Sequence, residues 1–322
     1  MKYVEHGGEL SYPAPVVCEG GYFYNFFLEA TKENLAALCD RVFNTTSGGE
    51  AMYYPLTHVI MVTVGSIPKI YSGTLNVGWS PEKQVIIWLV LAKVKKEGSV
   101  LIAERPVLFP VYTMVPDLYS LVSGREVFGF FKSFGWVDLP YDPAVLNPPS
   151  LSLDVFGLKK FGPDEEAKRW PLLEFTRRSG SEGTGKTWSG LKELFHDIRP
   201  HLWGDEGPVI LPGLGFPVSL LGDFLHHAMP LVFLKQFRDV TDDQNAAYQA
   251  IVEAPSPIHS LHAELMGEYD FSMAEALASY PLADDLGLKS QKAILSIKVK
   301  MDFEIGGGKI IWEAGNNRGK NE

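Results

Sequence analysis

The chain has 322 residues, of which 46% are hydrophobic and 12% aromatic, and its formal net charge is −10. The negative charge argues against a nucleic-acid partner and against an anionic membrane surface. The hydrophobic content excludes extended disorder. The 31 glycines and 22 prolines are typical of a turn-rich fold. We therefore expect a well-packed acidic protein that binds neither nucleic acid nor a membrane.

The cysteines and the apolar runs indicate a cellular compartment. Cys18 and Cys39 are the only cysteines, too few for a disulfide framework or a zinc cluster. No basic segment followed by an apolar run opens the chain, so no signal peptide is expected. The apolar-rich stretch 209–234 is long enough to span a membrane, but Pro, Asp and His residues interrupt it, which argues against a transmembrane helix. These features predict a cytoplasmic protein.

The first part of the chain contains mainly strand patterns and one helix. Tyr22–Leu28 is aromatic and predicts a strand. Thr31–Phe43 has apolar residues at helical spacing behind a threonine N-cap, which predicts a short helix. Three apolar runs bounded by Gly and Pro predict strands with buried faces: Val59–Val64, Val85–Leu91 and Val107–Val111. The aromatic segment Gly124–Trp136 predicts a further strand.

The last third of the chain again contains strand patterns. Leu231–Val240 and Ala246–Ala254 flank a polar loop suited to a hairpin. Ile294–Ile305 alternates strictly, with apolar residues on one face and polar residues such as Lys298 on the other. A glycine-rich turn then leads to a strand at Lys309–Glu313. Few helices and no strand–helix–strand rhythm predict an α+β fold that is β-dominated, with antiparallel strands.

Between these parts, residues 142–208 are rich in Pro, Gly and charge, and we expect an irregular excursion from the sheet. Within it, Gly180–Thr187 matches the phosphate-loop pattern G-x-x-x-x-G-K-[ST]. A strand-like Leu172–Thr176 precedes the motif and a helical Ser189–Ile198 follows it. A phosphate-binding loop, however, belongs to a parallel α/β sheet that also supplies a metal-holding Asp after an apolar strand. No such strand follows, so we favour a surface loop and keep nucleotide binding as the alternative.

Histidines near carboxylates give little indication of a metal site. His259 and His262 lie near Glu264 in the sequence, but residues three apart on a strand point to opposite faces. We therefore expect no metal and no cofactor.

The segment Gly124–Trp136 carries the strongest chemical signal. Read as a strand, it places Lys132 on one face with four aromatic rings: Phe128, Phe130, Phe134 and Trp136. Desolvation among such rings disfavours the ammonium form of a lysine. The neutral amine is a nucleophile that forms a Schiff base with a ketone. The residues alone favour a simpler alternative, a lysine on an edge strand with its head in solvent and the aromatic rings in the core.

The same segment resembles the active-site signature of the acetoacetate decarboxylase family, in which G-R-E leads to the Schiff-base lysine. The residues that match in order are Gly124, Arg125, Glu126, Gly129 and Lys132. The segments SYPAP, LKQFRDVTDDQNAAYQAIVEA and PLADDLGL resemble further parts of the family, so that the likeness covers roughly 10–140 and 224–313. The resemblance implies a cone-shaped antiparallel β-barrel around an apolar cavity, in a homo-oligomer. It also implies a single domain over 1–322, with an enlarged irregular insertion at about 142–223.

The chain departs from the family pattern at several positions. The decarboxylase has a second lysine directly after the nucleophile, whereas this chain has Ser133, and Phe131 stands where proline is common. No arginine precedes Arg41, although the decarboxylase has one in its N-terminal strand. Glu82 is the candidate for the family's pocket glutamate. These departures indicate a carbonyl substrate that is larger or less charged than a small β-keto acid.

The resemblance implies a Schiff-base-forming lyase that acts on a keto acid or related carbonyl compound, with decarboxylation as the first expectation. The alternatives are an aldolase, retro-aldolase or dehydratase that uses the same imine on a larger carbonyl substrate, and a non-catalytic barrel that binds an apolar ligand. Lys132 and Glu82 are the candidate catalytic residues. Four further residues are candidates for substrate binding: Arg125, Glu126, Phe128 and Phe130. For Arg125 and Glu126 we favour structural roles, because adjacent strand residues face opposite ways.

Overall fold

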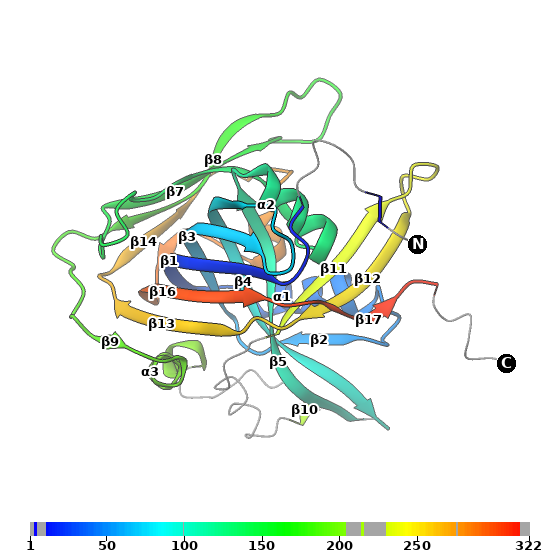
Figure 1. The fold of residues 1–322 in the computed structure, drawn as a ribbon, viewed down its shortest axis with the longest axis horizontal. Coiled ribbons are helices and arrows are strands. Elements are labelled where there is room, and N and C mark those ends of the chain that lie inside the picture. The colour runs from blue at the N-terminus through cyan, green and yellow to red at the C-terminus, as the bar shows by residue number, and fades with distance from the viewer. Residues whose placement is uncertain are drawn as a thin grey trace.

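The computed structural model describes residues 3–4, 11–98, 100–203, 214–215, 230–274 and 276–315. The helices are α1 (Lys32–Cys39), α2 (Leu118–Ser123), α3 (Leu191–Trp203) and α5 (Leu282–Leu286), with π-helical turns η1 (Asp40–Asn44) and η2 (Gly124–Phe128). The strands are β1 (Val16–Glu29), β2 (Met52–Pro55), β3 (Val59–Ser72), β4 (Trp79–Glu97), β5 (Val100–Val115), β6 (Lys132–Asp138), β7 (Ser150–Gly157), β8 (Lys168–Arg177), β9 (Thr187–Trp188), β10 (Leu214–Gly215), β11 (Leu231–Arg238), β12 (Ala246–Ala254), β13 (Ile258–Leu265), β14 (Tyr269–Met273), β15 (Gln291–Lys292), β16 (Leu295–Ile305) and β17 (Lys309–Glu313). The β-dominated α+β class predicted from the sequence is confirmed (Figure 1).

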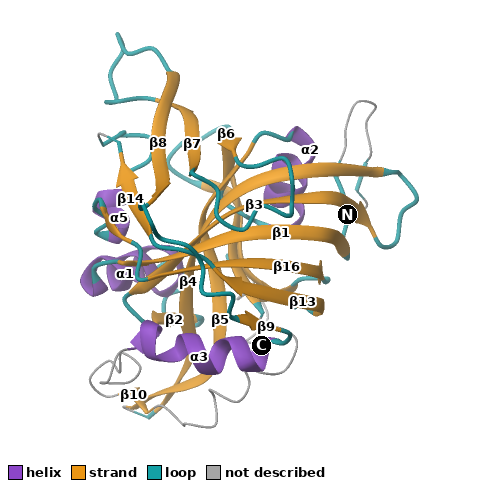
Figure 2. Cartoon of the chain, turned by 90° about the vertical axis from the view of Figure 1, so that its left-hand side faces the viewer, coloured by secondary structure: helices purple, strands orange, loops and turns teal. Residues whose placement is uncertain are grey.

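The main sheet carries the site. Its strands β13, β16, β1, β3, β4 and β5 are consecutive antiparallel neighbours. In Figure 2, β3, β1, β16 and β13 lie one below another. Most strand pairs are antiparallel, as predicted, but β5 also pairs in parallel with β6, β10 and β11. A second group of strands, β6, β7, β8, β14 and β15, continues from β6. The pairings among the described residues do not close into a ring, so a closed cone-shaped barrel is not confirmed.

The second half of strand β1 is buried on both faces, which explains why aromatic residues stand at consecutive positions there. Phe23, Asn25 and Phe27 point into a cavity, whereas Tyr24 and Phe26 belong to the core shared with the second group of strands. The Phe26 ring stacks on Phe175 of β8 with a centroid distance of 3.8 Å. The second group of strands therefore covers the outer face of the main sheet and leaves the inner face to the cavity.

The segment 142–203 is more regular than predicted. It forms β7, β8, β9 and α3, and β8 pairs with β14 near the end of the chain. Helix α3 buries the apolar residues Leu194, Phe195, Ile198 and Leu202. The predicted helix at Ser189–Ile198 is thus confirmed in type but begins and ends later. That this segment is an insertion into a single domain stays a prediction.

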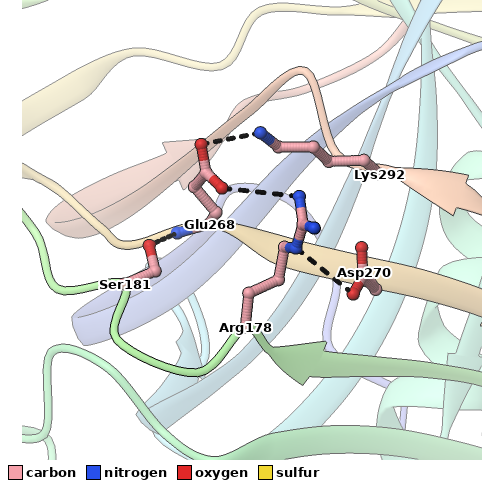
Figure 3. Close-up of polar contacts among 5 residues, drawn as sticks. All are labelled: Arg178, Ser181, Glu268, Asp270 and Lys292. Carbon is pink, nitrogen blue, oxygen red and sulfur yellow. Dashed lines mark hydrogen bonds and ion pairs between the residues drawn. The ribbon is translucent and has the colours of Figure 1, made fainter.

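The phosphate-loop-like motif links antiparallel strands and does not open a helix of a parallel sheet. It begins after β8, where the Arg178 guanidinium lies 3.6 Å from the carboxylates of both Glu268 and Asp270. The Glu268 backbone N–H donates to Ser181 Oγ, and Lys292 Nζ lies 2.6 Å from the Glu268 carboxylate (Figure 3). Lys186, the lysine of the motif, pairs with Asp197 of α3 at 2.8 Å. The surroundings that a phosphate-binding loop requires are absent from these described strands, as predicted.

In the part of the chain that the structure describes, no helix is both long and apolar enough to cross a membrane. Most of the apolar stretch 209–234 lies outside the described residues. Cys18 and Cys39 are buried free thiols.

The predicted polar face of β16 is not solvated. Lys298 is only 1% exposed, and its Nζ donates to the carbonyls of Pro143 and Val145 at 2.6 Å each. The side chain lies over the Tyr24 ring, with Nζ 5.5 Å from its centroid. Burial, with a smaller contribution from the charge of Lys300, lowers the pKa of Lys298 to about 8. Alternation alone missed this burial because the second group of strands covers that face.

Stability is expected to depend on pH through Lys298. The unfolded chain keeps this lysine protonated up to about pH 10.4, whereas the folded chain releases the proton near pH 8. The unfolded state therefore binds more protons in this window, and the free energy of unfolding rises with pH. Between pH 7.5 and 9.5, the free energy of unfolding of the wild type should rise relative to that of Lys298→Met by an amount on the order of 1–2 kcal/mol, measured by urea titration.

The exposed Lys83 provides the matched control, since Lys83→Met should show no such change with pH. Burial raises the pKa of Tyr24 and Tyr269 in the folded protein. Above about pH 10 these tyrosines therefore ionise in the unfolded chain first, which lowers the free energy of unfolding. The titrations stay below that pH for this reason. A stability difference between wild type and Lys298→Met that is constant over this range would contradict the prediction.

Candidate active site

Lys132 lies where the chain enters β6, and the structure corrects the strand predicted for Gly124–Trp136. Asp117 caps α2 by accepting a hydrogen bond from the Ser120 backbone N–H at 2.8 Å. The π-helical turn η2 follows α2, and Gly129 ends it in the left-handed region with φ 97°. Only from Lys132 onward is the backbone a strand. Aromatic alternation outweighed the Asp and Gly end signals in the sequence prediction, and that prediction is wrong for residues 124–131.

Gly124 makes room for the Lys132 side chain. A Cβ atom at position 124 would lie 2.6 Å from Lys132 Cδ and 2.7 Å from its Cε, well inside van der Waals contact. The first residue of the G-R-E signature is therefore a packing requirement of the lysine. The backbone carbonyl of Gly124 also accepts hydrogen bonds from the N–H groups of Gly129 and Phe130, both at 2.9 Å, which holds the turn beneath the lysine.

Gly124→Ala is expected to displace the Lys132 amine without unfolding the protein, because the added methyl group meets a flexible side chain. A displacement of about 1 Å at a reacting group can lower a rate by about 100-fold, so covalent trapping of a ketone at Lys132 should slow by roughly 10- to 100-fold. The measurement is the rate of borohydride-dependent adduct formation. Gly307→Ala is the control, since its added Cβ has open space within 4 Å. Equal trapping rates in both variants would refute this packing role.

The amine of Lys132 lies in a small polar group inside the protein. Lys132 is 8% exposed and Glu82 of β4 is 4% exposed. Lys132 Nζ lies 3.6 Å from Glu82 Oε1, donates a hydrogen bond to Ser120 Oγ, and lies 5.2 Å from the centroid of the Phe130 ring. The structure thus brings together the two residues predicted as catalytic.

The four aromatic residues predicted to surround Lys132 divide into two pairs. Phe128 and Phe130 line the cavity, and Phe130 packs on Phe233 with a centroid distance of 4.4 Å. Phe134 and Trp136 pack on each other at 4.7 Å and do not line it. The predicted cluster of four rings around Lys132 is therefore wrong for the second pair. The reason is that β6 leaves β5 after Phe134 and pairs with β7.

Arg125 and Glu126 lie on η2, outside the cavity that Lys132 enters. Arg125 is exposed, and its Nη1 donates to the backbone carbonyl of Lys132 at 3.1 Å. This contact anchors the start of β6. Arg125 also lines a second, more open pocket together with Lys132 and Ser133. Substrate binding by Arg125 and Glu126 therefore stays a prediction, and the contact with the Lys132 carbonyl agrees with the structural role that the sequence favoured for Arg125.

The cavity has a volume of about 250 Å³ and runs along the inner face of the main sheet. Among its described lining residues, Lys132 is the only lysine or arginine and Glu82 the only carboxylate. The other polar residues that line it are neutral: Asn25, Thr63, Ser80, Gln84, Ser120, Ser123 and Ser256. The cavity therefore offers a substrate one amine, one carboxylate and otherwise neutral walls.

The charges of Glu82 and Lys132 both act on the thiol of Cys18, which also lines the cavity. Burial raises the pKa of the Cys18 thiol, the charge of Glu82 raises it further, and the charge of Lys132 opposes the shift. The thiol is therefore held neutral and is not an activated nucleophile. Lys132 remains the candidate nucleophile of the cavity.

Sequence reasoning missed Ser120, Gln84 and Cys18 as cavity residues. Ser80, Glu82 and Gln84 occupy alternate positions at the start of β4, ahead of an apolar run, and this row of inward polar residues was an available signal. No comparable signal marks Ser120 of α2, because its contact with Lys132 depends on the turn η2, which brings the chain back toward α2.

No group of three His, Cys, Asp or Glu residues that could hold a metal ion occurs among the described residues. His259 and His262 contact separate carboxylates, those of Glu304 at 3.9 Å and Glu264 at 3.6 Å.

Solved structures share this arrangement of strands over most of the chain. Acetoacetate decarboxylase from Legionella pneumophila subsp. pneumophila str. Philadelphia 1 matches with a TM-score of 0.57 and 10% identity, over 94% of this chain and 89% of that one. An acetoacetate decarboxylase-like enzyme from Sphingomonas wittichii RW1 matches with a TM-score of 0.55 and 14% identity, over 97% and 98%. The enduracididine biosynthesis enzyme MppR, complexed with the condensation product of pyruvate and imidazole 4-carboxaldehyde, matches with a TM-score of 0.53 and 12% identity, over 95% and 92%.

No protein-family model and no curated protein matches the sequence. The likeness to solved structures nevertheless extends over almost the whole chain. The chain therefore has the acetoacetate decarboxylase-like fold, and the resemblance inferred from the sequence is confirmed at the level of the fold.

Proposed function

We propose that this chain is a carbon–carbon lyase in which Lys132 forms a Schiff base with a carbonyl substrate, and that its reaction is the decarboxylation of a β-keto acid. The observation that carries the proposal is a buried primary amine 3.6 Å from the only carboxylate among the described residues of an otherwise neutral cavity. A buried lysine beside a base is the arrangement that imine chemistry requires. A homo-oligomeric state stays a prediction.

The proposed reaction uses groups that lie within reach of one another. The neutral Lys132 amine attacks the carbonyl carbon, and the carbonyl oxygen leaves as water. In the protonated imine, the bond to the carboxylate carbon breaks, its electron pair moves to the imine nitrogen, and CO₂ leaves. The resulting enamine takes a proton at carbon, and water then releases the ketone and restores the amine. Glu82 is the residue placed to move these protons.

The neutral surroundings suit this reaction. A substrate carboxylate is poorly solvated beside Phe128 and Phe130, whereas CO₂ carries no charge, so the environment favours its loss. Ser120 accepts a hydrogen bond from the amine and orients Nζ toward the cavity.

Borohydride trapping tests the proposal. The protein is incubated with a panel of keto acids and reduced, and the modified peptide is identified by mass. We expect the adduct on Lys132 and not on Lys298, a control lysine that is also buried, at 1% exposed against 8% for Lys132, but does not line the cavity. Release of CO₂ in the unreduced reaction identifies decarboxylation. The absence of an adduct across the panel, or an adduct on other lysines only, would rule out the imine.

Aldol-type chemistry through the same imine is the second candidate. Ser133 occupies the position of the second lysine of the decarboxylase family, and MppR, which shares the fold, is complexed with a condensation product of pyruvate and an aldehyde. An aldehyde product, or consumption of an added aldehyde without CO₂, would favour this reaction. A non-catalytic barrel, the third reading of the sequence, predicts ligand binding with no adduct and no product.

A further inference from the structure

The cavity is long in the direction of the strands. Glu82 and Trp88 both line it from β4, and a strand rises by ~3.3 Å per residue, so six residues correspond to about 20 Å. Strand β3 gives the same order, because Ile67 pairs with Glu82 and Met61 with Trp88. The space therefore extends by about 20 Å from the level of Glu82, beside the Lys132 amine, to Trp88, and it also continues past Glu82 in the other direction to Ile70, Val16 and Ile305.

The space is also narrow. Its volume of about 250 Å³ is slightly below the roughly 300–1,000 Å³ of typical small-molecule sites. A length of about 20 Å and a small volume together fit a slender chain and do not fit a bulky ring system.

The polar groups along the middle of the cavity are already bonded to one another. Trp88 Nε1 donates to Thr63 Oγ1 at 3.0 Å, and Thr63 Oγ1 donates to Asn25 Oδ1 at 2.7 Å. Asn25 Nδ2 donates to the backbone carbonyl of Phe23 in its own strand at 3.4 Å and to that of Ile297 in β16 at 3.5 Å. These groups therefore require no partner from a ligand, and the remaining wall here is apolar, with Phe27, Met61 and Ile86. This part of the cavity suits an apolar chain.

Helix α3 forms the far end. Leu194, Ile198 and Leu202 of α3 line the cavity together with Val59 of β3 and Val90 of β4. In Figures 1 and 2, α2, next to Lys132, and α3 lie on opposite sides of the molecule. The cavity thus runs from the amine to an apolar end built by the helix of segment 142–203.

At the amine end, Gln84 offers an unused polar group. It is 6% exposed and lines the cavity two residues from Glu82 on the same face of β4. No side-chain hydrogen bond of Gln84 is found in the described part of the chain, and its amide is not among the fully buried unpaired atoms there, so the amide is accessible from the cavity. Its N–H₂ can donate to an oxygen of a substrate whose carbonyl carbon lies at Lys132.

We propose that the substrate is a carbonyl compound with a long unbranched aliphatic chain and a second oxygen near the reacting carbonyl, as in a long-chain 3-oxo acid. The carbonyl lies at Lys132, the second oxygen accepts from Gln84, and the chain runs along the cavity to α3. This inference rests on the proposed function for the position of the carbonyl. The aliphatic chain of the substrate is inferred independently, from the shape and the apolar walls of the cavity.

A binding series tests the chain without depending on catalysis. Lys132→Met is titrated with 2-alkanones of increasing length, and binding is followed by tryptophan fluorescence, with Trp88→Phe in the same background to identify the reporter. We expect affinity to rise about fourfold per methylene, the equivalent of ~0.8 kcal/mol, until the chain fills the cavity. Affinity that does not rise with length would overturn the proposal.

The same series separates the two proposals. A rise in affinity with length, combined with no borohydride adduct in the wild type, would reject the Schiff base and retain the long apolar ligand. An adduct with short and long ketones at equal affinity would retain the Schiff base and reject the long chain.

Variants at the far end give a second test in the wild-type background. Leu194→Phe on α3 and Val59→Phe on β3 each shorten the space, so trapping of long ketones should slow at least tenfold while trapping of short ketones changes less than twofold. Lys192→Ala, on the exposed side of α3, should change neither. Two positions are used because overpacking can destabilise one variant. An unchanged chain-length profile in a folded variant contradicts the proposal, and if neither folds, the binding series decides.

The second oxygen is tested at Gln84. Gln84→Leu in the Lys132→Met background should weaken binding of a long 3-oxo acid by up to about tenfold, as expected for one hydrogen bond. Binding of the 2-alkanone of equal length, which lacks that oxygen, should change less than twofold. An equal loss of affinity for both ligands would show that Gln84 does not recognise the second oxygen of the substrate.

Discussion

Lys132→Met is expected to abolish turnover, with a loss of at least about 10⁴-fold, because no other amine lines the described cavity. Methionine has a similar length and lacks the nucleophile. The measurement is steady-state turnover of the keto acid that gives the strongest borohydride adduct, together with the mass of the reduced protein. Turnover within tenfold of the wild type would show that Lys132 is not the nucleophile.

A control is needed because the substitution leaves Glu82 buried without its cation. Glu82 is 4% exposed, and removing one partner of a buried ion pair typically costs about 3–5 kcal/mol. The double variant Lys132→Met/Glu82→Gln removes the unpaired charge and should recover part of the thermal stability. Turnover should remain absent in both variants. Recovery of stability without activity would separate the chemical role of the amine from its contribution to the fold.

Glu82→Gln is expected to lower turnover by about 10²- to 10⁴-fold, the range for losing a general acid or base. Glutamine keeps the shape of the side chain but cannot move a proton, and Glu82 is the only carboxylate among the described residues that line the cavity. If Glu82 acts mainly after imine formation, the adduct on Lys132 should still reach full yield with longer incubation. The ratio of trapping rate to turnover therefore reports the step at which Glu82 acts.

Glu104→Gln is the matched control for this substitution, since Glu104 is exposed on β5. It should leave both the trapping rate and turnover unchanged. Turnover of Glu82→Gln within threefold of the wild type would exclude proton transfer by Glu82 and leave it as the counter-ion of Lys132.

Local patterns predicted most elements, because strand alternation and helix capping depend on neighbouring residues. Leu295–Ile305 forms the strand that its alternation indicated, and α1 begins directly after Thr31. Leu231–Arg238 and Ala246–Ala254 pair as the predicted hairpin. The prediction that Lys132 and Glu82 belong to one site required the family resemblance. Strands β4 and β6 do not pair with each other, and no local pattern indicates that these two side chains meet.

The sequence by itself determined the β-rich class, the position of most strands and the candidate lysine, since periodicity, turn residues and a short motif are local properties. The turn before Lys132 is also local, and its end signals at Asp117 and Gly129 were outweighed by the aromatic alternation. Only the tertiary structure decided the burial of Lys298 and the length of the cavity. Both depend on a surface supplied by a distant segment: the loop at Pro143 and Val145 over Lys298, and α3 across the far end of the cavity. A residue pattern specifies which face of a strand is apolar, but whether the other face meets water or protein depends on contacts between remote parts of the chain.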